Sequence, residues 1–384
     1  MTNKFMRLYL AVLTFTMPVV AQSDALRAIY KRSATIPTNV EGIRAYPTPP
    51  SGFDPLAASD EELAAYGIPM RPDKVHEPAE YRQWTRLAML MSNPHARWYG
   101  ELKPRRVRGN LGTATLSPNG DQNRDQGAVF ATSVQGKGWS GVVNTVSGTT
   151  WSKTKSFQWV TGEFNVPYPQ QAFSGSGNIC DGDTDQASFW VGLGGLTVTG
   201  VNLGNQNNIA QAGIDIFAYC GIGTAQGAYA WVEWFPGASV GLYSVNAADD
   251  IMVNITNTSA TAGSFVVADY TNQTVAGYTI TAPPGYKLVG NEAEYIVERP
   301  GGDQNTPTGL YPLANYIWSF WDFTRSRAFT GTYYYPGNTN SSTYDVSMTD
   351  DSGSIIISVP SIDKGLQNLF VYNQNCSYAN GCTP

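Results

Sequence analysis

Carboxylates and amides, rather than histidines, are the side chains available for catalysis over most of this sequence. The chain has two histidines, His76 and His95, and none follows His95. A Ser-His-Asp or Cys-His nucleophile needs an imidazole base, and most zinc sites need imidazole ligands. Chemistry in the later part of the chain must therefore rest on carboxylates, amides, hydroxyls or the backbone. Carboxylates work best as acids and bases near their own pKa, so we expect activity at acid pH.

Two glutamates share one predicted strand, Ala293 to Glu298 (AEYIVE). Alternation along a strand places Glu294 and Glu298 on one face together with Ile296. Their backbones are then about 13 Å apart, at about 3.3 Å per residue, which is too far for a direct pair of carboxyls. A catalytic partner for either glutamate must therefore come from another strand.

Glu233 and Gln211 are the candidate partners. Glu233 lies in a Trp-Glu-Trp stretch on the same strand face as Trp231, where burial between indoles would raise its pKa. Gln211 lies in a strand of small residues, and its amide N–H is a suitable donor to a developing oxyanion. Taken singly, each pattern also has a plainer interpretation: glutamates facing solvent, a surface glutamine, and tryptophans that only pack.

Taken together, these segments resemble the glutamic peptidases, the eqolisin family of acid endopeptidases. The matching stretches follow the family's order: Gly138 to Gly141, Phe164 to Pro167, Trp190 to Gly192, Ile209 to Asp215, Ala230 to Pro236 and Ala293 to Glu298. The resemblance covers most of residues 135–300, and its last three stretches are the most specific.

The resemblance implies roles for particular residues. Gln211 and Glu298 fall on the family's catalytic glutamine and glutamate, and Trp190 and Glu233 on positions that line its substrate cleft. Trp139 matches another cleft aromatic, and Trp231, beside Glu233, joins the expected substrate-binding residues. Hydrolysis then needs no covalent intermediate, cofactor or metal, and pepstatin should not inhibit it.

Two departures from the family pattern remove acidic groups from the expected cleft. The loop after Trp190 continues Val-Gly-Leu-Gly-Gly, where the family typically has an Asp-containing turn. Tyr229 stands where an Asp often precedes the Trp-x-Glu-Trp stretch. Neither change touches Gln211 or Glu298.

The elements that must position these residues are strands. The residues after Asp125 are poor in charge and rich in Gly, Thr, Ser, Tyr and Trp, a composition typical of strands. Strand patterns occur at 157–166, 187–193, 209–215, 228–234, 251–255, 264–270, 274–280, 293–298 and 354–359. Many short strands separated by turns predict an all-β fold, an antiparallel β-sandwich of jelly-roll-like or concanavalin-like form. The resemblance implies the same fold, with its cleft on a concave sheet.

The N-terminal part has a different character. Residues 1–21 read as a signal peptide, with a basic start and 13 apolar residues from Leu8 to Val20, too few to cross a bilayer. Residues 22–125 read as a basic pro-region with helices near 60–67 and 81–91, ending in an exposed linker from Lys103. We therefore expect a secreted, extracellular zymogen whose β-sandwich catalytic domain is 126–384.

Charge and cysteines fit this division. Through Asp125 there are 16 Lys and Arg against 12 Asp and Glu; afterwards there are 8 against 18. The pro-region should therefore bind the acidic domain as an intramolecular inhibitor, and acidification should loosen it by protonating carboxylates. An acidic mature domain does not favour nucleic acid as a partner.

An even number of cysteines in an exported chain favours disulfides, and we prefer Cys180–Cys220 and Cys376–Cys382.

Other interpretations remain open on sequence alone. A jelly-roll glycoside hydrolase with Glu233 and Glu298 as its acidic pair explains the tryptophans but not Gln211. A secreted lectin or adhesin explains the sandwich but not a processed pro-region. The single Asp-Ser-Gly at Asp351 reads as a turn rather than half of an aspartic-peptidase dyad, and 181–185 departs from an EF-hand calcium loop. We expect a monomer that acts on proteins or peptides, with no membrane partner.

Overall fold

The structure of the protein, a computed structural model, describes most of the chain after its first 33 residues. The described residues are 34–105, 111–116, 132–170, 173–174, 177–178, 184–219, 225–301, 310–316, 318–338, 342–362, 368–374, 376–377 and 381–382. The expected signal peptide, Cys180, Cys220 and residues 181–183 of the acidic stretch lie outside them.

One sheet, the front sheet, carries all the residues expected to be catalytic. From one edge to the other it contains β14 (Val240–Val245), β13 (Ala225–Phe235), β12 (Ile209–Tyr219), β10 (Thr184–Leu193), β18 (Glu292–Glu298), β6 (Trp139–Thr145) and β21 (Thr343–Thr349). All neighbours in this order are antiparallel.

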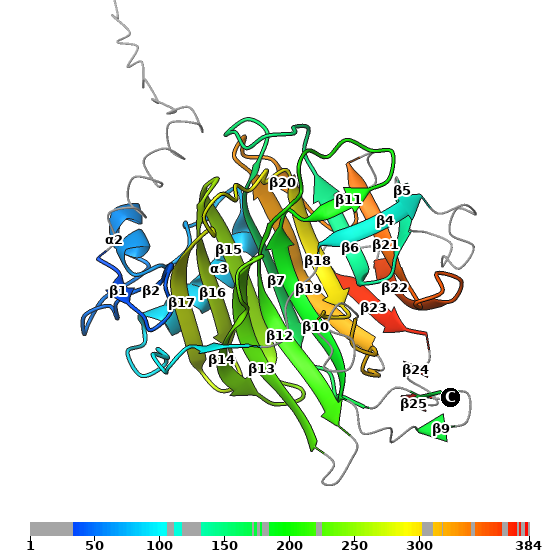
Figure 1. The fold of residues 1–384 in the computed structure, drawn as a ribbon. Helices are drawn as coiled ribbons and strands as arrows, with labels where there is room; N and C mark the ends of the chain where they lie inside the picture. The colour runs from blue at the N-terminus through cyan, green and yellow to red at the C-terminus, as the bar shows by residue number, and fades with distance from the viewer. Residues whose placement is uncertain are drawn as a thin grey trace, which may run out of the picture.

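A second, back sheet packs against it. It contains β17 (Thr274–Thr281), β16 (Ala262–Asp269), β15 (Asp250–Ser259), β7 (Phe157–Asn165), β19 (Trp318–Ala328), β23 (Leu369–Asn373) and β22 (Ile356–Ile362). β22 also pairs with β21, which joins the two sheets at one side. The predicted antiparallel sandwich is confirmed, and Figure 1 shows its long strands side by side.

The main core lies between the sheets and is built by strand alternation. Front-sheet residues such as Val191, Ile214 and Val297 meet back-sheet residues such as Val253 and Phe265, and all five are fully buried. Each of the nine predicted strands lies on an observed strand. The pattern could find them because one face of each strand is apolar.

The N-terminal region lies on the back sheet and at its edge. It contains β1 (Ile36–Pro37), β2 (Ile43–Ala45), α2 (Asp60–Ala65) and α3 (Pro78–Ser92). Both helices were predicted. α2 begins with a capping box between Ser59 and Glu62, the local signal that fixes its first turn. β2 pairs with β17, so this region extends the back sheet (Figure 1).

The predicted linker is exposed at Lys103 and Pro104, as expected, but it forms strands that pair with the sandwich, and Gly112 and Ala114 are buried. Within it lie two strands, β3 (Lys103–Pro104), which pairs with β14, and β4 (Gly112–Leu116). β4 lies between β5 (Thr132–Gly136) and β11 (Leu196–Val198). The charged side chains of this segment suggested a linker and gave no sign of the two strands, because backbone pairing at a sheet edge does not depend on side-chain polarity.

Short elements complete the chain. They are β20 (Tyr333–Tyr334), β8 (Phe173–Ser174), β9 (Gly177–Asn178), β24 (Cys376–Ser377) and β25 (Gly381–Cys382). Backbone register sets Cys376 opposite Cys382, so their disulfide stays a prediction that the backbone permits. Neither described helix is long and apolar enough to cross a membrane.

Candidate active site

The face of the front sheet that points away from the core, here called the front face, collects the candidate residues. Strand register aligns them in three rows across β13, β12, β10, β18 and β6. The first row is Tyr229, Asp215, Ser188, Glu298 and Trp139; the second is Trp231, Gly213, Trp190, Ile296 and Gly141; the third is Glu233, Gln211, Gly192, Glu294 and Val143. The predicted shared face of Glu294, Ile296 and Glu298 is therefore confirmed.

Glu298 is fully buried and bound by tryptophan. Its Oε2 accepts a hydrogen bond of 2.7 Å from Nε1 of Trp190. The Trp190 ring meets the Trp139 ring edge to face, with 4.9 Å between centroids. Because both indoles are buried, they fix the direction of the Glu298 carboxylate. The structure thus brings together three residues that the sequence singled out.

Gln211 and Glu233 form a second direct pair. They stand opposite each other on β12 and β13, and Nε2 of Gln211 donates to Oε2 of Glu233 at 2.7 Å. Both side chains are buried, and Oε1 of Gln211 has no hydrogen-bond partner among the residues that the structure describes. A buried amide with an unused acceptor is unusual in a purely structural role.

Gln211 and Glu298 do not stand next to each other. β10 lies between their strands, and they lie four residues apart along the strand direction. That is about 10 Å across the sheet and about 13 Å along it, or roughly 16 Å between backbones. In this structure Nε2 of Gln211 is directed to Glu233 on β13, on the side away from β10.

Trp231 occupies the second row opposite Gly213. A Cβ on Gly213 would meet Cβ of Trp190 at 2.7 Å, so only glycine lets the two tryptophans flank this position. Trp231 belongs to the same apolar cluster as Trp190 and Trp139. Indoles therefore lie beside both catalytic candidates: Trp190 and Trp139 beside Glu298, and Trp231 beside the Gln211–Glu233 pair.

Glu292 and Glu294 form an acidic pair to which the sequence analysis gave no role. Both are fully buried, and burial raises the pKa of each carboxyl well above its ordinary value, with the charge of Glu292 raising that of Glu294 further. Oε2 of Glu292 accepts from the backbone N–H of Leu196 at 2.9 Å. Alternation in the sequence already placed Glu292 on the face of Glu298, and this signal could have found it.

Asp215 is another buried carboxylate of the front face that alternation in the sequence could have located. It lies four residues after Gln211 in the same strand, hence on the same face. Its Oδ1 accepts from the hydroxyl of Ser188 at 2.5 Å, and its Oδ2 pairs with Nη1 of Arg105 at 2.7 Å. The Arg105 guanidinium also lies 3.6 Å from the centroid of the Tyr229 ring.

Residues of the N-terminal region therefore contact both ends of the row that holds Glu298. Arg105 covers Tyr229 and Asp215 at one end. At the other end Gly112 lies against Trp139 so closely that a Cβ there would meet the indole at 2.3 Å. Beside it, β4 and β5 line a groove of about 430 Å³ together with Leu310. N-terminal residues thus cover both ends of the row that holds Glu298.

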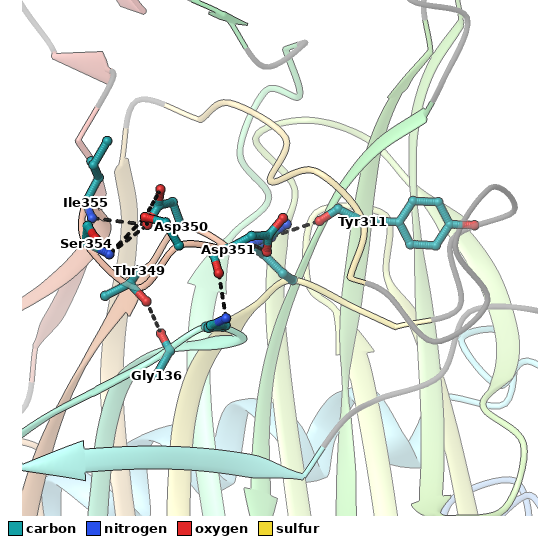
Figure 2. Close-up of polar contacts among 10 residues, drawn as sticks. Gly136, Tyr311, Thr349, Asp350, Asp351, Ser354 and Ile355 are labelled. Atoms are coloured by element: carbon teal, nitrogen blue, oxygen red, sulfur yellow. Dashed lines mark hydrogen bonds and ion pairs between the residues drawn. The ribbon is translucent and has the colours of Figure 1, made fainter.

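The Asp-Ser-Gly motif at Asp351 forms a turn after β21, as predicted. Figure 2 shows the Asp350 carboxylate accepting from the backbone N–H groups of Ser354 and Ile355, at 3.0 and 3.1 Å. Asp351 pairs with Nη1 of Arg299 at 2.8 Å. Since Arg299 directly follows Glu298, this ion pair fixes the end of β18.

Within the described residues, no group of three His, Cys, Asp or Glu side chains is placed to hold a metal ion. Glu298, Glu233 and Asp215 of the front face are bound by indole, amide, hydroxyl and guanidinium groups. Such a site can move protons and polarise a carbonyl through its own side chains.

Comparisons with known proteins identify the family. A sequence model described as the Peptidase A4 family matches residues 137–364. The chain is similar in structure to scytalido-glutamic peptidase with a transition state analog inhibitor, at 17% identity and a TM-score of 0.47, over 62% of this chain and 98% of that one. It is also similar to SCP-B, a member of the Eqolisin family in complex with the tripeptide Ala-Ile-His, at 18% identity and a TM-score of 0.45, over the same shares.

A third similar structure is aspergilloglutamic peptidase from Aspergillus niger, at 20% identity and a TM-score of 0.39, over 49% of this chain and 99% of that one. A comparison with curated protein sequences gave no match. The family match spans more than half of the chain, including every strand of the front face. The chain therefore belongs to the peptidase A4 family, and it is an endopeptidase of the glutamic class.

Proposed function

We propose that this peptidase is a secreted, acid-active enzyme, made as an inactive precursor, that cleaves peptide bonds with water activated by Glu298 and Gln211. The observation that carries the proposal is the fully buried Glu298 carboxylate, held by Trp190 in a face that also presents Gln211. A strand glutamate that served only solubility would face water.

Hydrolysis proceeds through general acid–base catalysis. Glu298, ionised, takes a proton from a water placed between itself and Gln211, and the hydroxide attacks the peptide carbonyl. Gln211 turns its amide from Glu233 to donate to the tetrahedral oxyanion. Glu298 then returns the proton to the leaving nitrogen. Trp139, Trp190, Trp231 and Glu233 line the substrate path, and no cofactor takes part.

The direct test is acid proteolysis by the processed protein. Incubation with denatured casein from pH 2 to 7, with pepstatin present, should give internal peptide-bond cleavage that is fastest in acid. Mass spectrometry of the fragments identifies the bonds cut. Absence of cleavage at every pH, with the protein folded and processed, would contradict the proposal.

The glycoside hydrolase alternative is disfavoured by the partner of Glu233. Its Oε2 accepts a hydrogen bond from Nε2 of Gln211 at 2.7 Å, and sugar chemistry does not require a glutamine there.

Inhibition in the precursor is supported by the contacts of Arg105. Its side chain pairs with buried Asp215 and stacks on Tyr229, in the row that holds Glu298. A peptide substrate cannot enter that row while Arg105 and Gly112 cover it. Proteolytic processing between about 110 and 138, followed by acidification, would release this segment from the front face. We call the segment the cover, and the structure describes it at residues 103–105 and 111–116.

Arg105→Ala is expected to speed activation. Removing the guanidinium leaves Asp215 buried without its cation, which weakens docking of the cover by a few kcal/mol. After a shift from neutral to acid pH, the variant should develop peptidase activity at least about tenfold faster than wild type. Lys103→Ala is the matched control, because Lys103 is exposed. Equal activation rates in all three proteins would contradict an inhibitory role for Arg105.

Stability should fall as pH rises toward neutral. Burial raises the pKa of Glu292 and Glu294, so the folded state binds their protons more tightly than the unfolded state does. Their contribution is therefore complete below about pH 4.5 and is lost as pH rises through the raised values.

Thermal unfolding measured from pH 4 to 8 should show a midpoint that falls by several degrees. The double variant Glu292→Gln with Glu294→Gln should flatten this dependence, because its amides do not titrate. A midpoint that rises with pH in the wild type would contradict the account.

We also propose that the protein is secreted and that it acts as a monomer. The basic start and short apolar run of residues 1–21 support export. The N-terminal residue of the secreted protein, read by mass spectrometry, should be at or just after residue 22 before processing. Retention of residues 1–21 would contradict cleavage of a signal peptide.

A further inference from the structure

Residues 34–102, here called the N-terminal layer, share a hydrophobic core with the back sheet. The layer contributes Leu63, Ile68, Trp84, Leu87 and Met91, and the outer face of the back sheet contributes Met252, Val266, Ala268, Tyr270 and Val275. All ten are buried. Without the layer, the sandwich would present this apolar face to water, which soluble proteins avoid over large areas.

The layer also completes the backbone pairing of β17. Ile43–Ala45 pairs with Tyr278, Thr279 and Ile280, and beyond it the N–H of Trp98 donates to the carbonyl of Val275 at 2.9 Å. β17 pairs on its other side with β16. Losing the layer would expose a long edge strand, a site at which other chains add.

Ion pairs cross this interface, and the layer and the back sheet each contribute an arginine to them. Arg86 of α3 contacts Glu163 at 2.5 Å and Asp250 at 2.6 Å on the back sheet. In the opposite sense, Arg325 of β19 contacts Glu80 of α3 at 3.5 Å. Arg325 is almost fully buried, so the two surfaces are matched in charge as well as in shape.

We propose that the N-terminal layer stays bound after activation, so that the active enzyme consists of two non-covalently associated chains. Only the cover, which the structure describes at residues 103–105 and 111–116, leaves the front face. This inference rests on the proposed processing between about 110 and 138. The N-terminal region then has two parts: a permanent layer on the back sheet and a removable cover on the front face.

Acid does not oppose this association at Glu163. Burial raises the pKa of Glu163 to about 7; the nearby charge of Asp250 acts in the same direction and Arg86 opposes it. Glu80 and Arg325 also lie at this interface, and Asp322 is the strand partner of Glu163. A raised pKa favours the docked, protonated form below about pH 4.5 and weakens docking as pH rises through 7.

The test separates docking from catalysis by cutting the chain with trypsin at neutral pH. Arginines at 106, 108 and 124 lie between the layer and the sandwich. The nicked protein is run on size exclusion at pH 4 and pH 7, and mass spectrometry identifies the chains. We expect the layer and the sandwich to elute together in equal amounts at both pH values. Separate elution, or an active sandwich that folds without the layer, would overturn the proposal.

Two variants of α3 provide a matched comparison. Arg86→Ala removes the contacts with Glu163 and Asp250 and, measured at pH 7, should raise the dissociation constant of the nicked layer at least about tenfold. Arg82→Ala removes an exposed arginine of the same helix and should leave it unchanged. If both variants hold the layer as tightly as wild type, the ion pairs do not secure it.

Because trypsin supplies the cut, the result is independent of peptidase activity. A nicked two-chain protein that lacks acid proteolysis would refute the proposed function but retain the docked layer. Acid proteolysis by a sandwich that has lost the layer would refute the layer but retain the proposed function.

Discussion

Glu298→Gln is expected to abolish peptide-bond cleavage while the protein still folds. The amide cannot take a proton from water or return it to the leaving nitrogen, and loss of such a group costs about 10²- to 10⁴-fold in kcat. The fold should survive because the Gln oxygen can still accept from Nε1 of Trp190, and the two side chains have nearly the same volume.

Folding of this variant is checked separately from activity. Its thermal midpoint in acid should match that of wild type within a few degrees, and the fluorescence of the buried tryptophans should be unchanged. Turnover near the wild-type rate in a folded Glu298→Gln protein would remove the assigned role.

Gln211→Ala is expected to lower kcat by about 10²- to 10³-fold, because it removes the donor to the oxyanion. KM should change little, since the donor acts mainly in the transition state. The measurement is steady-state hydrolysis of one peptide in acid. Gln158→Ala is the matched control: Gln158 is a buried strand glutamine of the back sheet, bonded by Nη1 of Arg327 at 2.9 Å.

A loss that appears only in KM would show that Gln211 binds substrate rather than stabilises charge. A loss of the same size in Gln158→Ala would show that any buried strand glutamine supports the fold. Either result would contradict the oxyanion role.

Local alternation was enough to place the catalytic face. In AEYIVE the glutamates and Ile296 share one parity, and the structure confirms this face together with that of Trp231 and Glu233. A period of two is intrinsic to the strand, so it can be read without knowing the neighbours. The same reading extends to Glu292 and Asp215, which lie at the same parity as Glu298 and Gln211.

Contacts between distant segments could not be read from sequence. Arg105 and Asp215 are 110 residues apart, and the charge run around Arg105 resembles an exposed linker. Its burial depends on the pairing of β3 with β14, a backbone interaction without a side-chain signature. The diagonal placement of Gln211 and Glu298 likewise depends on which strand lies between them.

The N-terminal layer shows a related limit. The apolar stripe of α3 predicted a helix but not its partner, because an apolar face is complementary to many others. Only the register of the back sheet places Met252, Ala268 and Val275 in one row to receive it. A region read as removable on charge alone is therefore built into the sandwich on one side.

The central claim is that Glu298 is the group that moves the proton. It is tested most directly by comparing Glu298→Gln with Glu292→Gln in acid, with one peptide and equal amounts of folded, processed protein. Glu292 is a buried glutamate of the same strand and face, bonded to a backbone N–H that a Gln oxygen can also accept. The account predicts that kcat/KM falls about 10²- to 10⁴-fold in Glu298→Gln and stays within severalfold of wild type in Glu292→Gln. Equal losses in both variants, or retained activity in Glu298→Gln, would contradict it.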